Sequence, residues 1–474
     1  MSSNIRVRFA PSPTGIMHLG NVRAAYLNFL FARQKKGTFI LRIEDTDAER
    51  NFDTGAKEII NDLSWLGITY DEGPGLPGMK YSYFQSERTF LYQEKLDALI
   101  QKNKVYRCFC SAELLEKKRE RQRALKQAPR YDQACFHLSE IEIAQRIQDK
   151  TPFIWRFHIQ KDQTIVINDL GHGTVTFDMN NFSDFPLTRQ DGSFTFIFAN
   201  FVDDWLMEIS HVFRGEDHLS NTANQALLYH AFSVDLPIYW HLPIIINQEG
   251  KKLSKRDFGF SLKDLQAEGF LPEAIANYLA TIGKSYKEEI MSFDELVKTI
   301  HFEGGQTAGQ VRYDVEKLRW MNHEWINKIS LDDLFVRINP FLNTAYPNHS
   351  HSETYIKHAL ESIKKELVTL HDAVAALNFC FVAPAPGYGL HSYQDAKVLK
   401  EIITTELPHF SDTEGFLALL KKAAQQKNIG IATLFCFMRL LLMGNTKGPS
   451  IGQIIEILGQ KESLIRIQNG LQTI

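Results

Sequence analysis

The chain has 474 residues, of which 44% are hydrophobic and 23% are charged, as in a globular protein that divides into several domains. It has no apolar run long enough to span a bilayer and no signal-peptide core at its N-terminus, so we expect a cytoplasmic protein that makes no membrane contact. Five cysteines are too few for a disulfide framework, and the net charge of −3 confines any nucleic-acid contact to local basic patches.

The N-terminus is predicted to fold as a strand, a stiff turn and a helix. Apolar and basic residues alternate in "IRVRF" (residues 5–9), and apolar residues recur at three-and-four spacing from Val22 onward. Between them, "APSPTGIMHLGN" (residues 10–21) places His18 near the helix start. Unpaired N–H groups there favour phosphate, and a histidine can donate to phosphate oxygens. A capping or surface histidine is the alternative, so the pattern needs a partner elsewhere in the chain.

A short basic segment supplies that partner. The stretch "KKLSKR" (residues 251–256) follows a strand-like run and a turn, so its cations lie on a loop. Such a cluster suits a triphosphate whose charge grows in the transition state. A second basic run, "EKKRERQRALKQAPR" (residues 116–130), fits a solvated helix as well as it fits an RNA contact.

Together, "HLGN" and "KLSKR" resemble the two signature sequences of class I aminoacyl-tRNA synthetases. The stretches "RFAPSPTG", "LRIEDTD", "YFQSER", "VDDWLM" and "RGEDHLSNT" resemble bacterial glutamyl-tRNA synthetases in the same order and at similar spacing. The stretches "GFLPEAIANYLA" and "DVEKLRWMN" extend the resemblance into the middle of the chain. The resemblance runs almost end to end and is least specific in the C-terminal third.

This resemblance implies an α/β fold, in which a split Rossmann-like class I catalytic domain carries an α+β insertion and precedes an all-α region. Strand-turn-helix units near the N-terminus and again from about residue 190 agree with that division. The expected segments are residues 1–92 (first catalytic half), 93–189 (acceptor-stem-binding insertion), 190–243 (second catalytic half), 244–328 (KLSKR loop and stem-contact helices) and 329–474 (helical anticodon-binding region).

The resemblance also implies a reaction, in which L-glutamate is joined to the 3′ end of tRNA(Glu) through a glutamyl-adenylate, with Mg²⁺-ATP as substrate and tRNA bound before activation. His18 is expected to act as a neutral hydrogen-bond donor, while Lys252 and Lys255 stabilise the leaving pyrophosphate. These three are the expected catalytic residues. The expected ATP-binding residues are His18, Gly20, Asn21, Lys252, Leu253, Ser254, Lys255 and Arg256.

Glutamate and glutamine are nearly isosteric, so a selective site must distinguish them by charge. By resemblance, Arg8 and Arg214 hold the side-chain carboxylate. From the residues alone, Arg8 fits the polar face of a strand and Glu44 a strand-end cap. Phe196 stands where the family commonly has tyrosine, which predicts weaker glutamate binding or a replacement donor. The expected glutamate-binding residues are Arg8, Ala10, Ser12, Glu44, Phe196, Asn200 and Arg214.

A second cluster has the spacing of a metal site. Cys108, Cys110, Cys135 and His137 form a C-x-C and a C-x-H pair separated by about two dozen residues. Four such ligands predict a closed, structural zinc site. Buried small residues beside a surface histidine are the alternative, and some members of the family lack zinc here.

Several alternatives remain open at this level. A catalytically inactive tRNA-binding paralogue would have eroded signatures, and a short paralogue that glutamylates a modified tRNA base would lack the helical C-terminal third. A non-discriminating enzyme that also charges tRNA(Gln), for later conversion by an amidotransferase, is the harder alternative. The stretch "ESIKKELVTL" (residues 361–370) carries Lys364, Lys365 and Glu366 where discriminating enzymes often have arginine. We expect a monomer.

Overall fold

The structure is a computed structural model that describes residues 4–13, 17–46, 53, 55–76, 81–302, 309–387, 389–390, 393 and 395–474. Residues 14–16 and Asp47, which belong to the motifs quoted above, lie outside these residues. The chain divides into two compact units, Met1–Asp264 with Ala276–Val315 and Leu265–Ile275 with Glu316–Ile474. Among the described helices, none has the length and apolar character needed to cross a membrane. The finer division into five segments stays a prediction.

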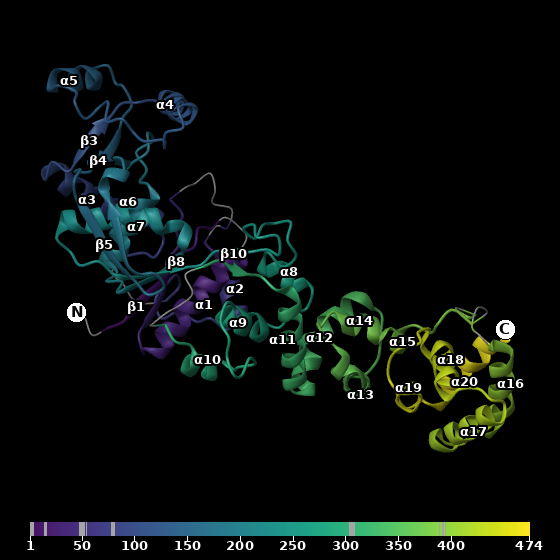
Figure 1. The fold of residues 1–474 in the computed structure, drawn as a ribbon. Coiled ribbons are helices and arrows are strands. Elements are labelled where there is room, and N and C mark those ends of the chain that lie inside the picture. The colour runs from purple at the N-terminus through teal and green to yellow at the C-terminus, as the bar shows by residue number, and fades with distance from the viewer. Residues whose placement is uncertain are drawn as a thin grey trace. The chain divides into compact units, whose positions relative to one another are not determined.

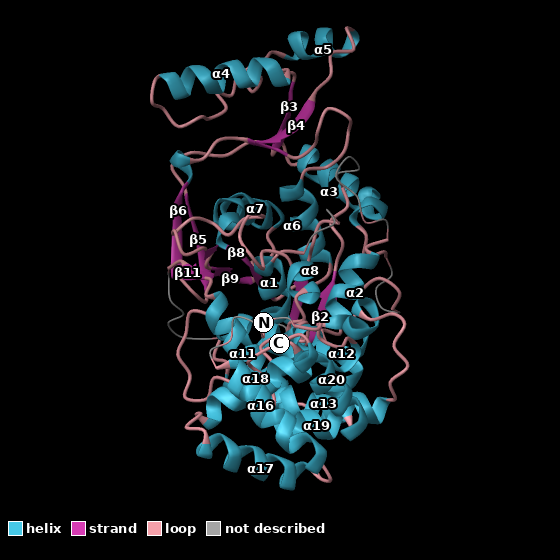
Figure 2. Cartoon of the chain, turned by 90° about the vertical axis from the view of Figure 1, so that its right-hand side faces the viewer, coloured by secondary structure: helices cyan, strands magenta, loops and turns pink. Residues whose placement is uncertain are grey.

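The strands lie in the first unit (Figures 1 and 2). In the described part of the chain they pair in the orders β1-β2, β10-β11, β3-β4-β7 and β6-β5-β9-β8. Their bounds are β1 (Arg6–Phe9), β2 (Thr38–Leu41), β3 (Val105–Cys108), β4 (Ile154–Phe157), β5 (Thr164–Asp169), β6 (Gly173–Asp178), β7 (Phe185–Pro186), β8 (His211–Gly215), β9 (Ile238–Leu242), β10 (Ile245–Ile246) and β11 (Val311–Arg312).

A parallel arrangement of strands forms the centre of the first unit. β1 pairs with β2, and β9 pairs with both β5 and β8, all in parallel. The backbone N–H of Ser210 donates to Arg6 O at 2.9 Å, which places β1 beside β8. The carboxyl ends of such strands meet at one edge, where ligands bind in open α/β sheets. Strand β5 comes from the segment predicted as an insertion, yet it extends this central sheet.

Helices cover the sheet of the first unit. Phe198 and Phe201 of α6 belong to the same buried core as Ile167 of β5 and Tyr239 of β9, and α6 lies beside α7 (Figure 2). The helices of this unit are α1 (Leu19–Gln34), α2 (Lys57–Trp65), η2 (Gln85–Arg88), α3 (Thr89–Gln101), α4 (Ala112–Ala124), α5 (Glu140–Gln148), η3 (Met179–Asn181), α6 (Phe196–Leu206), η4 (Glu216–His218), α7 (Leu219–Phe232) and α10 (Phe293–Thr299), while α8 (Leu262–Ala267) and α9 (Pro272–Thr281) have residues in both units.

The second unit is built from helices around its own apolar core (Figure 1). Serine side chains cap the starts of several of them: Ser330, Ser352 and Ser450 each accept a hydrogen bond from a backbone N–H of the first turn. The predicted all-α C-terminal region is thereby confirmed. The helices are α11 (Val315–Lys328), α12 (Leu331–Ala345), α13 (Glu353–Ile363), η5 (Lys364–Glu366), α14 (Asp372–Ala376), α15 (Asn378–Phe381), α16 (Ala396–Glu406), η6 (Leu407–His409), α17 (Thr413–Gln426), α18 (Ile431–Met443), α19 (Ile451–Leu458) and α20 (Gln460–Gln472).

Candidate active site

A cavity of about 380 Å³ opens at the carboxyl ends of β1 and β8. Its volume suits a small polar molecule. The structure brings all seven residues predicted to bind glutamate to this one cavity, although they come from segments far apart in the sequence. The lining residues are Arg8, Phe9, Ala10, Pro11, Ser12, Asn21, Ala24, Glu44, Phe196, Asn200, Phe213, Arg214, Gly215 and His218.

Three buried charged residues line the cavity, namely Arg8, Glu44 and Arg214, and Arg8 and Glu44 belong to a larger network of buried charges. Arg8 donates through Nε and Nη2 to the two carboxylate oxygens of Asp204, at 3.0 and 3.3 Å. Arg42 Nη1 donates to Asp204 Oδ1 at 2.6 Å, and Arg88 Nε donates to Asp203 Oδ1 at 2.7 Å. The buried arginines of the cluster are Arg8, Arg42, Arg88 and Arg214, and its buried carboxylates are Glu44, Asp203 and Asp204. When all are ionised, these described residues carry one more positive than negative charge.

Of the two arginines that line the cavity, Arg8 is paired with Asp204, and Arg214 has two buried donors without a partner among the described residues. Its Nη2 donates to Thr222 Oγ1 at 2.5 Å and to Gln225 Oε1 at 2.8 Å. Its Nε and Nη1 are buried and have no hydrogen-bond partner among the described residues. Because a buried unpaired donor is costly, these two N–H groups are available to a ligand acceptor in the cavity that Arg214 lines.

Glu44 provides hydrogen-bond acceptors in the same cavity in which Arg214 provides donors. Asn200 Nδ2 donates to Glu44 Oε1, and Arg42 Nη2 lies 3.5 Å from that oxygen. Burial raises the pKa of Glu44, while Arg42 and Arg8 pull it downward and do not fully offset the burial. A buried carboxylate of this kind can accept hydrogen bonds from a ligand ammonium group.

His218 lies beside Phe196 at the cavity wall. Their ring centroids are 5.3 Å apart. Burial and the charge of Arg214 lower the pKa of His218 to about 4, so the imidazole is neutral at pH 7. Asn221 Nδ2 donates to His218 Nδ1 at 3.2 Å, which leaves the ring proton on Nε2. Where tyrosine would supply a hydroxyl donor, the wall therefore has a phenylalanine and an adjacent imidazole N–H.

His18 forms the N-cap of α1. Its Nδ1 accepts the backbone N–H of Asn21 at 3.3 Å, so the proton of the neutral ring is on Nε2. Burial and the nearby charge of Lys252 lower the pKa of His18, which favours the neutral form. A Cβ at Gly20 would lie 3.1 Å from two His18 ring atoms, so a side chain here would push the ring away from the helix start.

The segment that follows residues 251–256 is paired with the start of α1. Leu19 N–H donates to Phe260 O and Leu262 N–H donates to Met17 O, each at 3.0 Å. The His18 ring also stacks on Phe260, with centroids 5.5 Å apart. The structure thus brings the two motifs together within the first unit.

The 251–256 loop presents its cations to solvent. Leu253 is buried and its N–H donates to Ile245 O at 3.0 Å, which anchors the loop. Lys252 Nζ lies 3.1 Å from Asp217 Oδ2. Ser254, Lys255 and Arg256 are exposed, and the two cations have no ion-pair partner among the described residues. Of these cations, Lys252 is near enough to lower the pKa of His18, and the ATP-binding set stays a prediction.

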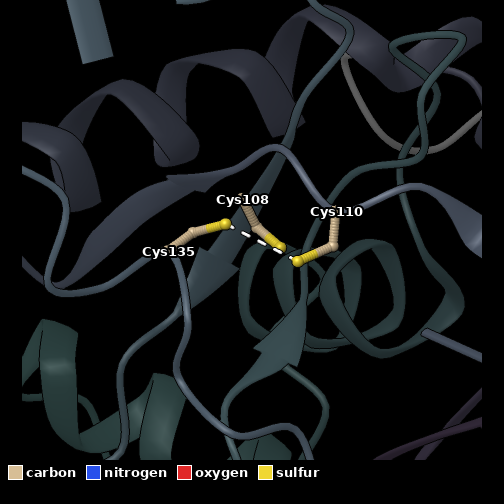
Figure 3. A group of neighbouring side chains, drawn as sticks. All are labelled: Cys108, Cys110 and Cys135. Atoms are coloured by element: carbon tan, nitrogen blue, oxygen red, sulfur yellow. Dashed lines mark hydrogen bonds between the residues drawn. The ribbon is translucent and has the colours of Figure 1, made fainter. Parts of the chain in front are cut away.

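Three of the four predicted metal ligands form a compact cluster. The Sγ atoms of Cys108, Cys110 and Cys135 all lie within 4.8 Å of one another (Figure 3). The Sγ atoms of Cys110 and Cys135 are 3.6 Å apart, close to the about 3.8 Å that two thiolates adopt on one tetrahedral zinc ion. The hydroxyl of Tyr131 lies 3.2 Å from Cys108 Sγ and 3.8 Å from Cys110 Sγ.

His137 does not join this cluster, although the sequence spacing predicted that it would. Phe136 stacks on His158 with a centroid separation of 3.9 Å, and the next side chain, His137, is exposed to solvent. The oxygen of Tyr131, which the sequence analysis did not consider, takes the neighbouring position.

Comparison of the chain with models of known families shows which protein family it belongs to. The model of the class I tRNA synthetases (E and Q), catalytic domain, matches residues 4–320, more than half of the chain. The chain belongs to this family of class I tRNA synthetases. A model of an anticodon-binding domain matches residues 333–471 of the synthetase. Membership in a class I synthetase family implies ATP, with Mg²⁺, as a substrate.

Named relatives resemble the synthetase over its full length. It is 36% identical to glutamate–tRNA ligase 2 of Caldicellulosiruptor saccharolyticus over 98% of each chain, and 36% identical to the glutamate–tRNA ligase of Listeria monocytogenes over 99% of each. Among solved structures, the glutamate tRNA ligase of Elizabethkingia meningosepticum in complex with its amino acid matches with a TM-score of 0.86 and 30% identity, over 99% of both chains. The predicted family and fold class are confirmed.

Several residues that shape the site were not predicted from the sequence. Asp204, Thr222 and His218 lie within stretches that were quoted for the family resemblance, but no role was predicted for them. Asp203 and Asp204 carried a usable signal, because two acids in the apolar run of α6 need buried partners. Arg42 carried a similar signal as a lone cation after an apolar strand.

Proposed function

We propose that this synthetase joins L-glutamate to tRNA(Glu) in an ATP-dependent reaction. One observation carries the proposal: the buried charged residues that line the cavity, Arg8, Arg214 and Glu44, carry a surplus of positive charge, and Arg214 has two donors without a partner among the described residues. Glutamate has two carboxylates and one ammonium group, so its net negative charge balances that surplus. Glutamine would leave the charge unbalanced and a carboxylate-matched arginine partly unpaired, which disfavours it. The names of the full-length relatives point to the same substrate.

In this proposal, a glutamate carboxylate oxygen attacks the α-phosphorus of ATP. The new oxygen–phosphorus bond forms as the bond from the α-phosphorus to the bridging oxygen breaks, and pyrophosphate leaves with that electron pair. His18 donates from Nε2 to phosphate oxygen, while Lys252 and Lys255 balance charge on the leaving group. A ribose hydroxyl at the tRNA 3′ end then takes the glutamyl group and releases AMP.

The tRNA partner is proposed to contact both parts of the chain that were predicted for it, residues 93–189 at the acceptor stem and residues 329–474 at the anticodon. Lys364, one of the three residues that stand where discriminating enzymes often have arginine, donates through Nζ to Ile329 O at 2.5 Å and is therefore engaged in the fold. Lys365 is exposed and remains available to RNA. Charging of tRNA(Gln) as well as tRNA(Glu) is the second candidate. We propose a monomeric enzyme.

We further propose that zinc binds at Cys108, Cys110 and Cys135. The separations of their sulfur atoms fit thiolates on one ion, and the Tyr131 oxygen is a nearby fourth donor atom. All these residues lie in the predicted acceptor-stem-binding segment. Zinc there would order the segment and take no part in the chemistry.

A charging assay tests the proposed function. The full chain is incubated with ATP and radiolabelled glutamate, and either purified tRNA(Glu) or purified tRNA(Gln). We expect acid-precipitable label with tRNA(Glu), dependent on ATP. Label on tRNA(Gln) at a similar kcat/KM would identify the non-discriminating enzyme. No label on either tRNA, in protein that exchanges pyrophosphate with another amino acid, would overturn the proposal.

A further inference from the structure

Three neighbouring strands place polar side chains in a row behind the cavity. Arg214 on β8 is the register partner of His241 on β9, and β9 in turn pairs with the end of β5, where Asp169 lies. All three residues are buried, and they lie at the carboxyl ends of parallel strands. Thr222 of α7, also buried, lies between His241 and Arg214.

Asp169 is held as a carboxylate that accepts hydrogen bonds through both oxygens. Its Oδ2 accepts the backbone N–H and the Nδ1–H of His241, at 3.0 and 2.6 Å. Its Oδ1 accepts the backbone N–H groups of Gly171 and His172, each at 2.8 Å. Burial would raise the pKa of Asp169, but the bonds from His241 and His172 outweigh it and hold the pKa at about 2.

The carboxylate fixes which nitrogen of His241 carries the proton. Because Asp169 can only accept, Nδ1 must donate, and Nε2 of the neutral ring is left as an acceptor. Burial keeps the ring neutral by lowering the pKa of His241, although the bond to Asp169 raises it in part. The Thr222 hydroxyl, 2.7 Å away, therefore donates to Nε2.

The direction of that bond determines what Thr222 can offer to Arg214. With its hydrogen turned toward His241, Oγ1 presents lone pairs to Nη2 of Arg214. A competing acceptor exists, since His218 O lies 3.2 Å from the same Oγ1. Without His241, the hydroxyl would turn to His218 O, and the bond that holds Nη2 would lose its alignment.

We propose that Asp169, His241 and Thr222 are positioning residues that orient the guanidinium of Arg214 for a substrate side-chain carboxylate. The inference rests on the proposed function and deepens it. Because the guanidinium is planar, holding Nη2 at Thr222 and Gln225 also fixes the directions of the Nε–H and Nη1–H bonds, which have no partner among the described residues. A charged donor held in a fixed direction binds a carboxylate oxygen more strongly than the neutral oxygen of an amide, which favours glutamate over glutamine.

The test compares binding of the two amino acids in full-length variants. Thr222→Val removes the hydroxyl and retains the shape of the side chain. We expect the KM for glutamate in tRNA-dependent pyrophosphate exchange to rise about tenfold or more, because a bond that aligns a charged group is lost. The Ki of glutamine as a competitor should change by less than about threefold, and the KM for ATP should stay the same. Thr222→Ser retains the hydroxyl and should restore glutamate binding.

A matched control variant separates the loss of Arg214 alignment from the effect of removing any buried hydroxyl group. Thr281 is also buried, but its hydroxyl donates to carbonyls of its own helix, Asn277 O and Tyr278 O, so Thr281→Val should leave the glutamate KM unchanged. His241→Asn provides a second test if Thr222→Val fails to fold, since the amide can still donate to Asp169 but does not reach Thr222.

The outcomes are distinguishable from failure of the proposed function itself. Wild-type protein that does not charge tRNA with glutamate would overturn the function. Wild-type protein that does charge glutamate, together with a Thr222→Val variant whose glutamate KM is unchanged, would overturn the inference alone. Equal losses for glutamate and glutamine would have the same consequence, because they would indicate a structural role.

Discussion

Lys252 Nζ and Asp217 Oδ2 are 3.1 Å apart and form an ion pair at the edge of the 251–256 loop. Both side chains are largely exposed, so the pair stabilises the fold by less than about 1 kcal/mol. Phosphate oxygens can therefore take Lys252 from Asp217 at little cost. Lys255, two positions after the buried Leu253, has no ion-pair partner among the described residues and needs no such exchange.

Lys255→Ala should lower the rate of glutamate activation by about 10² to 10³, with little change in the glutamate KM, because the lysine acts on charge that develops in the transition state. Pyrophosphate exchange in the presence of tRNA measures both quantities. Lys251→Ala is the matched control: this lysine is in the same loop, is exposed and pairs with Glu249, so its loss should leave the rate unchanged. Equal effects of the two variants would remove Lys255 from the mechanism.

Arg8 and Arg214 should respond differently to removal, although both line the cavity. Arg8→Ala takes away one of the two arginines that neutralise Asp204, and we expect a loss of folding stability approaching the about 3–5 kcal/mol typical of breaking a buried ion pair. Arg214→Ala deprives no carboxylate of an ion-pair partner among the described residues. It should instead shrink the kcat/KM ratio of glutamate to glutamine by at least about tenfold.

Urea denaturation and competition kinetics check this pair of variants together. A stability loss for Arg214→Ala as large as that for Arg8→Ala would contradict the assignment. So would an Arg214→Ala variant that loses the same factor for both amino acids, since that pattern indicates a contact with their shared α-carboxylate.

The N-terminal elements could be predicted because their pattern is local. Alternation in residues 5–9 gives β1, and helical spacing after His18 gives α1, which begins at Leu19. The seven cavity residues were predicted from the resemblance to glutamyl-tRNA synthetases. The balance of buried charges around them could not be predicted in this way. Arg8 meets Asp204 across nearly two hundred positions of sequence, and no local pattern indicates which buried charges become neighbours.

Two features of the site depended on tertiary packing. In the sequence, strand β5 was predicted to belong to an insertion. In the structure it pairs with β9, and this pairing places Asp169 behind the cavity. The spacing of Cys135 and His137 fits a metal site, but the stacking of Phe136 on His158 leaves His137 exposed, and this stacking joins residues that are distant in sequence. Side-chain direction on a loop is decided by such contacts.

His218 should give the enzyme a characteristic loss of stability in mild acid. Burial and Arg214 lower its pKa to about 4, whereas the unfolded chain takes up that proton near pH 6.5. As the pH falls from 6.5 toward 4, the unfolded state is protonated first, so the free energy of unfolding drops by up to about 1.4 kcal/mol per pH unit from this group. Above pH 6.5 the group has no effect.

Urea unfolding at pH 7.5 and pH 5.0 measures this dependence. His218→Gln should unfold with a smaller difference between the two pH values than the wild type, because glutamine does not titrate. Other groups contribute equally to both proteins, so the difference between them isolates His218. Parallel pH dependences would show that His218 is accessible to protons in the folded state.

Substitution of the cysteines should affect zinc binding, whereas substitution of His137, which lies outside the cysteine cluster, should not. Protein purified without chelators should contain about one zinc per chain by elemental analysis, and Cys110→Ser should lose it, since the Cys110 sulfur lies 3.6 Å from that of Cys135. His137→Ala should retain the zinc, because the His137 side chain is exposed and outside the cluster. Tyr131→Phe should bind the ion less tightly.

Removing the zinc should weaken binding of the acceptor end of tRNA, because the cysteines belong to residues 93–189. It should leave ATP binding intact, because His18 and Lys252 lie outside that segment. Loss of an ordering ion unfolds the segment that it holds, so Cys110→Ser should raise the KM for tRNA. Because activation is proposed to require bound tRNA, the exchange rate of this variant should recover at saturating tRNA. Zinc-free wild-type protein with an unaltered tRNA KM in Cys110→Ser would show instead that the three cysteines are small buried residues of the core.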